Sequence, residues 1–389
     1  MTTPSLVSIV IATQNRRDVV LSTLEELHKP ERIGCDCEII VVVNPSTDGT
    51  ADAIRRDFRD VQVIRLEENL GSCAKSVGVD RAGGEYVVFL DDDSYPRPGS
   101  VTRMVARFKV DGRLGAAGFV VYLPDGRREC SAFDHVFAGC GVGFRRGALQ
   151  SVGGLDSALF MQAEEYDLSF RLIAAGWKIK TFADLAVDHL KTSHARLSGR
   201  TVYYDTRNNL ILTARYLADP HERIFRSDWL KRYRWIAADN GHRLDYWRGR
   251  LAGRRRRRRE REGYTRWRLS ASAFEELFHV DYIAQCIRRL TVEGVGTIIL
   301  AGLGKNIYPF VDAARLAGLS VTCIADDRFA RPGRRYRGHA IVPAKDALAR
   351  RLDAIVISDT SPVHAEETHR QFTGLTDVPI HRWFGYDVQ

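Results

Sequence analysis

The sequence has 389 residues, 44% of them hydrophobic, and a formal net charge of +9. This is enough chain for two folded domains, and the hydrophobic share excludes a wholly disordered protein. No apolar run reaches the about 18 residues of a transmembrane helix, and the first residues lack a basic segment and cleavage site, so we expect a cytoplasmic protein.

The first region alternates apolar, β-branched runs with helical patterns, which predicts a parallel sheet covered by helices on both faces. The expected strands are VSIVIAT (7–13), EIIVVVN (38–44), VQVIRL (61–66) and EYVVFL (85–90). In such sheets ligands bind beyond the carboxyl ends of the strands. Residues 13–16, 44–50 and 91–93 should therefore gather at one edge.

Three consecutive aspartates, Asp91 to Asp93, follow the last of these strands. Their mutual repulsion is offset if a hard divalent cation such as Mg²⁺ or Mn²⁺ binds there, because these ions prefer oxygen ligands and keep positions open for phosphates. The competing interpretation is an acidic turn in which Asp93 or Ser94 caps the helix that residues 100–108 suggest. The triplet alone leaves both open.

A second acidic site lies in AEEYDLSFRLIAAGW (163–177). Leu168 and Leu172 are one helical turn apart, so the segment predicts a helix with its acids in the first turn. Acids there either compensate the helix dipole or serve chemistry.

Residues 223–268 hold 17 Lys/Arg, 5 Asp/Glu and four of the six tryptophans. This basic segment divides the chain into residues 1–215, a helical part at 216–292, and residues 293–389. A solvated helical face is one interpretation of the charges. Tryptophan and tyrosine between arginines also suit an anionic membrane surface, which would make the protein peripheral at the inner face of the membrane. No nucleic-acid-binding motif is present.

The last region begins with a strand, a glycine turn, a helix and a second strand that ends at Asp326, a Rossmann-like α/β unit. Gly302 and Gly304 match the first two glycines of a dinucleotide fingerprint, but Ile307 takes the third position. Dinucleotide binding, a regulatory ligand, acceptor recognition and a structural or dimerising role stay open. We favour no bound cofactor in this unit.

Seven cysteines, an odd number in apolar segments, indicate reduced thiols rather than a disulfide framework. Only Cys35 and Cys37 are close neighbours, and without a second Cys/His pair nearby they indicate packing rather than a zinc site.

Several segments together resemble family 2 glycosyltransferases, which have a nucleotide-diphospho-sugar-binding GT-A fold. The resemblance covers about residues 5–215 and rests on order and spacing. It is strongest to the rhamnosyl- and galactofuranosyl-transferase-like branch. The segments that carry it are VSIVIATQNR, VVVNPSTDGT, NLGSCAKSVGVDRAGGEYVVFLDDDSYPRPG, GGLDSALFMQAEEYDLSFRLIAAGWKI, VDHLKTS and RTVYYDTRNNL.

The resemblance assigns the family's DxD metal motif to Asp91 and Asp93 and its late metal-binding histidine to His189, with His194 as the competing candidate. It implies Mn²⁺ or Mg²⁺ as cofactor. The general base matches Glu165, one methylene longer than the Asp usual there, with Glu164 as the second choice. Donor contacts carried over are Thr13, Asn15, Arg16, Asn44, Asp48, Asn69, Lys75, Asp91 and Asp92.

Two departures concern the donor. The family often has Asp-Asn after the second strand, where this chain has Val43-Asn44, and a frequent Asn appears here as Ser76. Both leave the nucleobase and sugar open.

The expected function is metal-dependent, inverting transfer of a sugar from a nucleotide-diphospho-sugar to a hydroxyl of a glycan, lipid-linked or small-molecule acceptor. Two alternatives are an NAD(P)-dependent sugar-nucleotide oxidoreductase that uses the last unit, and a non-catalytic nucleotide-sugar-binding protein. An oligomer is compatible with the sequence.

Overall fold

The first part of the chain forms one mixed sheet. The computed structural model describes residues 7–191 and 198–383. The strands of this sheet are β1 (Val7–Thr13), β2 (Cys37–Val43), β3 (Gln62–Arg65), β4 (Tyr86–Asp91), β5 (Ser94–Pro96), β6 (Leu114–Tyr122), β7 (Arg128–Glu129), β8 (Gly141–Arg145) and β9 (Lys178–His189). Their order is β3-β2-β1-β4-β8-β6-β9-β5, with β7 beside β6.

The strands up to β4 are parallel, as the sequence predicts. Beyond them the sheet departs from that expectation, because β8 runs antiparallel to β4 and β6, and β5 runs antiparallel to β9. Between β6 and β8 the chain forms only β7 and no helix, which suits the antiparallel pairing of these two strands. The first part is therefore an α/β fold with a mixed sheet rather than a wholly parallel one.

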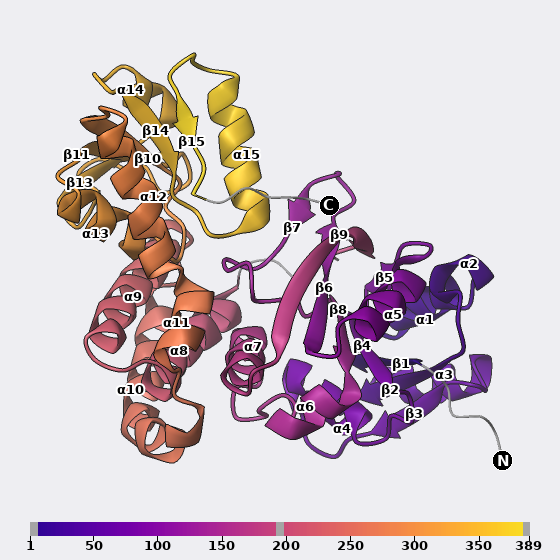
Figure 1. The fold of residues 1–389 in the computed structure, drawn as a ribbon. Helices are drawn as coiled ribbons and strands as arrows, with labels where there is room; N and C mark the ends of the chain where they lie inside the picture. The colour runs from indigo at the N-terminus through magenta and orange to yellow at the C-terminus, as the bar shows by residue number, and fades with distance from the viewer. Residues whose placement is uncertain (1–6, 192–197, 384–389) are drawn as a thin grey trace.

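Helices cover both faces of this sheet (Figure 1). Ile9 and Ile11 of β1 pack with one set of helices, and Val10 between them packs on the opposite face, because side chains alternate along a strand. The first face carries α1 (Arg17–Leu27), α3 (Thr50–Asp57) and α5 (Ser100–Val110), and the second carries α4 (Lys75–Val79), α6 (Arg146–Val152) and α7 (Glu164–Ala174).

Helix α5 has Gly99 as its N-cap residue and begins at Ser100. Ser94 lies in β5, so neither Asp93 nor Ser94 caps this helix, and the acidic-turn interpretation of the triplet is wrong in that respect.

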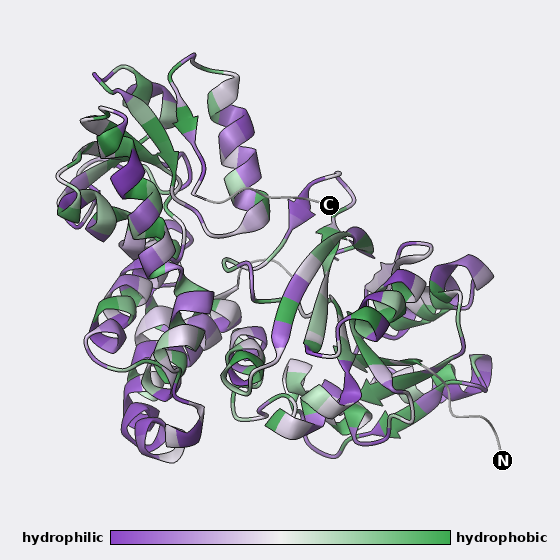
Figure 2. Cartoon of the chain, viewed as in Figure 1, coloured by the Kyte–Doolittle hydropathy of each residue, from purple (hydrophilic) through white to green (hydrophobic). Residues whose placement is uncertain are grey.

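A helical segment follows, made of α8 (Gly199–Tyr216), α9 (His221–Asp239), α10 (Arg243–Gly263), α11 (Ala271–Phe278) and α12 (Val280–Val292), with a short 3-10 turn, Thr265–Trp267, before α11. Phe225 and Trp229 of α9 are buried in the same apolar cluster as Phe170 of α7. The basic segment therefore packs one face into the core of the first part, while polar residues occupy its outer faces (Figure 2).

The last part is a second α/β unit, which we call the C-terminal unit. Its strands are β10 (Thr297–Ala301), β11 (Ser320–Ala325), β12 (Arg335–Tyr336), β13 (His339–Val342), β14 (Ala354–Ile357) and β15 (Ile380–His381), in the order β12-β13-β11-β10-β14-β15. All neighbours are parallel except β12 and β13. Helices α13 (Tyr308–Leu316), α14 (Ala344–Leu348) and α15 (Pro362–Thr373) pack on it, so the predicted second α/β sheet is present.

The C-terminal unit contacts both preceding parts. Arg128 of β7 pairs with Glu366 of α15 at 2.5 Å, and the Thr360 hydroxyl donates to the carbonyl of Ala132 at 2.8 Å.

All seven cysteines are free thiols. Within the ranges 7–191 and 198–383, no helix is both long and apolar enough to cross a bilayer.

Candidate active site

The predicted donor residues gather at the carboxyl ends of neighbouring strands. In the parallel register, Thr13 at the end of β1 lies opposite Val43 of β2, and Ala12 lies opposite Asp91 of β4. The three strands therefore end level with one another. Because the turns after them start from the same edge, residues far apart in sequence meet there.

Hydrogen bonds fix these turns. The side-chain oxygen of Asn15 accepts from the Thr47 amide at 2.7 Å, and Asp48 accepts from the amide of Arg17 at 2.9 Å. These bonds tie the turn after β1 to the turn after β2, so the two loops are positioned as one surface.

The segment before α4 is held in the same way. The amide of Asn44 accepts from Leu70 N at 2.8 Å and donates to Gly71 O at 3.1 Å, and Asn69 accepts from Gly71 N at 2.9 Å. Part of the hydrogen-bonding capacity of Asn44 is thus used within the protein.

The first aspartate of the triplet is paired with Lys75. The Lys75 ammonium donates to Asp91 at 2.6 Å and to the carbonyl of Gly139 at 2.9 Å. Although burial opposes the charge of Lys75, the nearby Asp91 carboxylate raises its pKa. The Asp91 side chain is still 40% exposed, whereas that of Lys75 is 4% exposed. Asp91 is therefore the member of the triplet that solvent reaches most readily.

The other two aspartates share Arg16. Its guanidinium donates to Asp92 at 2.5 Å and to Asp93 at 2.8 Å, and the Thr13 hydroxyl adds a bond to Asp92 at 2.6 Å. Burial raises the pKa of Asp92 to about 6. Burial acts in the same direction on Asp93, but bonds from His189 and Arg16 outweigh it and lower the pKa of that carboxyl. Positive protein groups thus offset the repulsion within the triplet.

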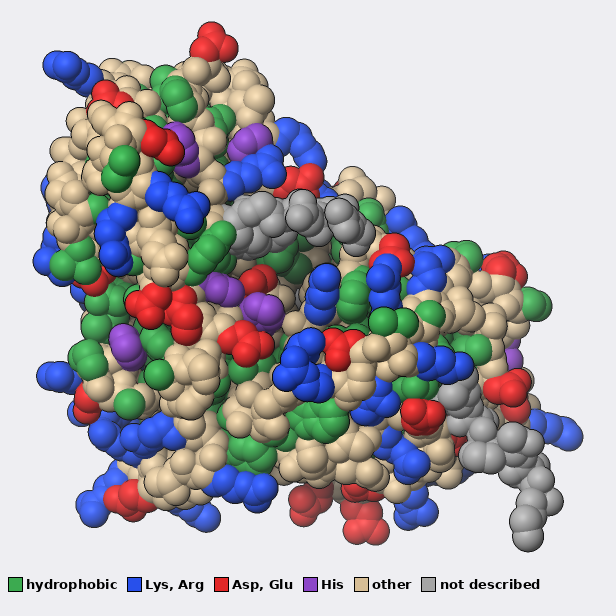
Figure 3. Space-filling model, in the orientation of Figure 1, with side chains coloured by type: hydrophobic (Ala, Val, Ile, Leu, Met, Phe, Trp, Pro, Cys, Tyr) green, Lys and Arg blue, Asp and Glu red, His purple; other side chains and the backbone are tan. Residues whose placement is uncertain are grey.

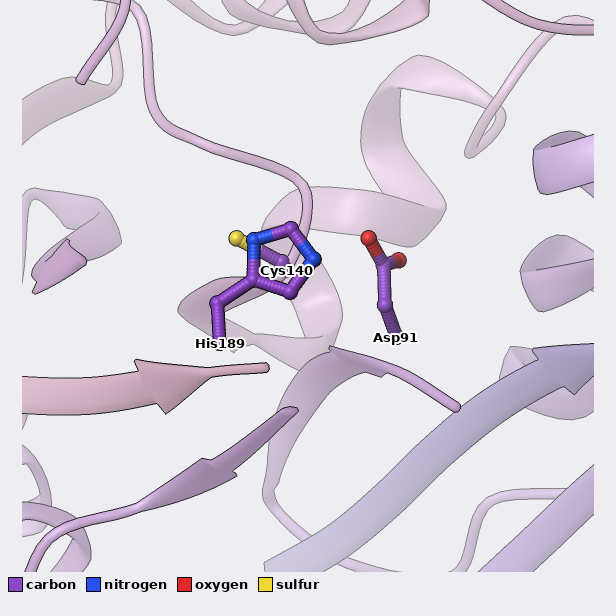
Figure 4. A group of neighbouring side chains, drawn as sticks. All are labelled: Asp91, Cys140 and His189. Carbon is purple, nitrogen blue, oxygen red and sulfur yellow. The ribbon is translucent and has the colours of Figure 1, made fainter. Parts of the chain in front are cut away.

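The structure brings His189 to the triplet. Its Nε2 lies 3.2 Å from an Asp93 oxygen, and its imidazole stands between the Asp91 carboxylate and the Cys140 thiol (Figure 4). One donor atom each from Asp91, Cys140 and His189 lie within 4.8 Å of one another. His194, the competing candidate, lies outside the described residues.

This donor set fits a divalent cation. His189 Nε2 lies beside Asp93, and the ring also neighbours Asp91 and Cys140, so an imidazole and two carboxylates meet here. An imidazole with carboxylates suits a Mn²⁺-like ion better than Mg²⁺, which takes oxygen ligands almost alone. Cys140 was not predicted from the sequence as part of this group.

The acidic helix α7 brings the second set of carboxylates. Glu164 is buried and accepts a hydrogen bond from the Ser72 hydroxyl, while its other oxygen has no partner in the described part of the chain. Glu165 is only partly buried, and its Oε1 would lie 3.1 Å from a Cβ added to Gly139. Surrounding protein and the repulsion of Glu164 raise the pKa of Glu165 well above its usual range.

The third acid of α7 has a structural role. The Asp167 carboxylate is fully buried and accepts from Arg171, from Arg215 at 2.7 Å and from the Tyr216 hydroxyl at 2.5 Å. Arg215 also binds Glu260 of α10 at 2.7 Å. This buried network, together with Asp156, locks α7 to α8 and α10, which fixes the direction in which Glu164 and Glu165 point.

Lys305 of the C-terminal unit lies beside this helix and was not predicted as a site residue. Its ammonium is 3.7 Å from the ring centre of Tyr166 and 4.5 Å from that of Trp229. Burial lowers the pKa of Lys305 against the attraction of Asp205. Tyr166 follows Glu165 directly, so the last unit reaches the acidic site. The only sequence feature that could have drawn attention to Lys305 is its position directly after the Gly302–Gly304 turn.

The glycine turn of the C-terminal unit is used within the protein. Both oxygens of Asp326 accept backbone bonds, from Leu303 N at 2.7 Å and from Phe329 N at 2.9 Å. A Cβ on Gly304 would lie 2.9 Å from Asp359 Cγ, so this glycine makes room for a side chain. These contacts do not favour the oxidoreductase alternative, in which Asp326 holds a ribose.

Comparison with known proteins gives a family match over part of the first sheet-forming region. Residues 8–153 match the model of "Glycosyl transferase family 2". A putative teichuronic acid biosynthesis glycosyltransferase, TuaG of Bacillus subtilis, is 38% identical over 97 residues, 23% of this chain and 36% of that protein. A UDP-Glc:alpha-D-GlcNAc-diphosphoundecaprenol beta-1,3-glucosyltransferase, WfaP of Escherichia coli, is 34% identical over 94 residues, again 23% of this chain and 36% of that protein. The matches thus span about a third of the length of these relatives.

The similarity to solved structures covers more of the chain, but at lower sequence identity. A mannosyltransferase of Pyrobaculum calidifontis in complex with GDP-Man and Mn²⁺ is 20% identical, with a TM-score of 0.45 over 65% of this chain and 76% of that one. S. aureus TarS 1–349 is 15% identical, with a TM-score of 0.48 over 86% of this chain and 99% of that one. Both scores are too low to carry an argument about function. On the family match and the sheet topology, the first part has the GT-A fold, and residues 8–153 of the chain match glycosyltransferase family 2.

Proposed function

We propose that the protein is a divalent-metal-dependent, inverting glycosyltransferase that moves a sugar from a nucleotide-diphospho-sugar to an acceptor hydroxyl. One observation carries this proposal: Gly139 joins the two acidic sites. Lys75, which pairs with Asp91, donates to the Gly139 carbonyl, and the Glu165 carboxylate lies against the same glycine. A donor group at the triplet and an acceptor group at α7 would therefore be neighbours.

The metal would be held by Asp91, Asp93 and His189. When bound, such an ion neutralises the negative charge that develops on the leaving diphosphate. Arg16 and Lys75 add fixed positive charge at the same edge, where they help to bind the diphosphate. Thr13 at the end of β1 and the loop residues Asn15, Asn44, Asp48 and Asn69 are the proposed contacts to the rest of the donor.

Glu165 is the proposed general base. The acceptor oxygen bonds to the anomeric carbon as the bond from that carbon to the diphosphate breaks, and the hydroxyl proton passes to the Glu165 carboxylate. Attack from the face opposite the diphosphate inverts the anomeric configuration. The raised pKa of Glu165 suits this role, because a carboxylate with a raised pKa holds a proton more strongly than an ordinary glutamate does.

The acceptor is proposed to be a glycan or a lipid-linked glycan. The named relatives support this, since one is a teichuronic acid biosynthesis enzyme and the other acts on a diphosphoundecaprenol-linked sugar. A small-molecule acceptor stays compatible with the site.

The proposal is tested by thermal stability with UDP, GDP, dTDP and their sugars, in Mn²⁺, Mg²⁺ or EDTA. Ligand at a hundred times its dissociation constant should add about 2.7 kcal/mol to the free energy of unfolding. We expect one nucleotide to stabilise the protein with metal, and EDTA to remove the effect. The Asp91→Asn variant should lose this shift. Stabilisation by NAD(P) alone would contradict the proposal and move the chemistry to the C-terminal unit.

A lipid-linked acceptor would require contact with a membrane, and α10 offers a surface for it. Leu244, Trp247 and Leu251 are 61%, 53% and 51% exposed. Their spacing of three and four residues places them on one face of the helix. The exposed arginines Arg254, Arg255, Arg258 and Arg259 follow. Apolar side chains beside arginines on one helix are typical of binding to an anionic interface.

We therefore expect the protein to co-sediment with anionic vesicles. Changing the four exposed arginines to glutamine should weaken binding roughly 10³-fold, at about 1 kcal/mol for each charge near the surface. Arg256 and Arg257 are kept, because they pair with the buried carboxylates of Glu260 and Glu222.

The matched control for this experiment changes three exposed arginines elsewhere, Arg55, Arg56 and Arg59, and should bind as the wild type does. Equal sedimentation of all three proteins, or no sedimentation of the wild type, would rule out α10 as the membrane contact.

A further inference from the structure

Two histidines and an aspartate meet where the first part, the helical segment and the C-terminal unit adjoin. Asp134 and His135 lie in the connection between β7 and β8, and His279 lies between α11 and α12. His279 Nε2 is 2.9 Å and 3.0 Å from the two oxygens of Asp134, and His135 Nε2 is 3.4 Å from one of them. The side chains thus converge from segments that are 144 residues apart in the sequence, between positions 135 and 279.

A hydrogen bond from His135 fixes the tautomer of its ring. It therefore decides which ring nitrogen presents a lone pair to the Asp134 carboxylate. Its Nδ1 lies 3.0 Å from the carbonyl oxygen of Ile179, which can only accept, so Nδ1 carries the proton. In the neutral ring, Nε2 is then an unprotonated acceptor pointing at an Asp134 oxygen. Two acceptors in that position repel each other unless a proton on Nε2 or a metal cation lies between them. A backbone carbonyl on the far nitrogen is also the usual way in which a metal-binding histidine is oriented.

The spacing of the donor atoms suits a small tetrahedral ion. With zinc–ligand distances of about 2.0–2.1 Å, the edges of the tetrahedron are about 3.3 Å long. The contact of His135 with Asp134 already has nearly this length, and the contact of His279 with Asp134 is shorter by a few tenths of an ångström. One donor atom from each of the three residues lies within 4.8 Å of the other two, so a small shift of side chains would complete the site.

The backbone at His279 supports a special role for this side chain. His279 has a φ of 52°, in the left-handed region that residues with a Cβ rarely adopt. This conformation lets one residue both end α11 and begin α12. Strain of this kind persists where the surrounding structure requires it, and such positions cluster at functional sites.

The group also borders a cavity. Asp134 and His135 line a pocket of about 760 Å³, whose other walls include Lys180 of β9 and Val363 of α15. Figure 3 shows histidine and acidic side chains gathered at the hollow between the two large parts of the molecule. Three protein ligands leave the fourth position of a tetrahedral ion for water or for a group that enters from this pocket.

We propose that Asp134, His135 and His279 bind a zinc ion that ties the connection before β8 to the helical segment. Two imidazoles and one carboxylate match the ligand preferences of zinc. The connection continues to Gly139 and Cys140 beside the candidate active site, so the ion would fix one end of a segment whose other end contacts Lys75 and Glu165.

The zinc content of the full-length protein tests this proposal. The purified protein is stripped with a chelator, loaded with Zn²⁺, desalted and analysed by mass spectrometry for metal. We expect His135→Gln and His279→Gln each to bind one zinc equivalent less than the wild type. The matched control is His28→Gln, because His28 pairs with Asp60 at 3.0 Å on the surface without a second histidine, and this variant should keep the wild-type content.

Equal zinc content in the wild type, His135→Gln and His279→Gln would overturn the proposal. A second measurement covers variants that fail to fold. Co²⁺ in a tetrahedral site absorbs strongly in the visible range, so cobalt-loaded wild type and a His189→Gln variant should both show this absorption, and Zn²⁺ should abolish it. Absence of a zinc-competed band in His189→Gln would show that only the candidate active site takes metal, and would equally overturn the proposal.

Discussion

Replacing Glu165 by glutamine should lower kcat about 10²–10⁴-fold, the usual contribution of a general base, while leaving donor binding intact. The amide keeps the size of the side chain against Gly139 but cannot take the proton of the acceptor hydroxyl. The measurement is steady-state transfer with the donor identified by thermal stability, together with the nucleotide-induced stability shift of the same variant.

The wild-type pH profile gives an independent check of this assignment. Because the pKa of Glu165 is raised, the base is protonated and inactive at low pH, and kcat/KM should rise with pH through a value above about 4.3, the pKa of an unperturbed glutamate. Glu164→Gln is the matched variant, because Glu164 precedes Glu165 in the first turn of α7 and accepts a hydrogen bond from Ser72. Full turnover of Glu165→Gln combined with loss of turnover in Glu164→Gln would move the base to Glu164.

Replacing Arg215 by methionine should destabilise the fold by about 3–5 kcal/mol, because it leaves buried carboxylates without their counter-charge. Arg215 is 1% exposed, and its partners Asp167 and Glu260 are 0% and 5% exposed. Removing one charge from such a buried network destabilises the fold far more than replacing the whole network by apolar residues would. Urea unfolding, followed by circular dichroism, measures the change in midpoint.

The control for this prediction is an arginine–glutamate ion pair on the surface. Arg258 and Glu262 of α10 are 90% and 67% exposed at a distance of 3.1 Å, and Arg258→Ala should change the stability by less than about 1 kcal/mol. If Arg215→Met were as mild as Arg258→Ala, the buried network would not hold α7, α8 and α10 together.

The sequence predicts the strand ends well, for a physical reason. Buried parallel strands need continuous apolar runs, and the polar residues that end each run must lie at the same edge. Asp91, Thr13 and Asn44 can therefore be grouped from the order of residues alone. The change to antiparallel pairing at β8 leaves no such signal in the sequence, because a short apolar run predicts a strand whichever way that strand runs.

Partners across the fold are harder to predict. The pairing of Arg16 with Asp92 and Asp93, and that of Arg215 with Asp167, joins residues 48 or more positions apart, and the sequence contains no pattern for such contacts. Asp167 illustrates the difficulty. It occupies a motif position beside Glu164 and Glu165, yet the structure uses it to hold the helix rather than to face a substrate. Cys140 was missed because its neighbours Asp91 and His189 come from distant segments of the first sheet, and Lys305 was missed because its contacts depend on how the last unit docks.

The contact of Lys305 with Tyr166 and Trp229 has a consequence for biosynthesis. A ribosome makes the acidic helix α7 long before residue 305, and domains fold in the order in which they emerge. A nascent chain that has completed the first sheet therefore still leaves the rings of Tyr166 and Trp229 without the ammonium that covers them. The neighbourhood of Glu165 reaches its final form only when the last unit has folded, so a prematurely terminated chain would carry the family motifs while the surroundings of α7 stayed incomplete.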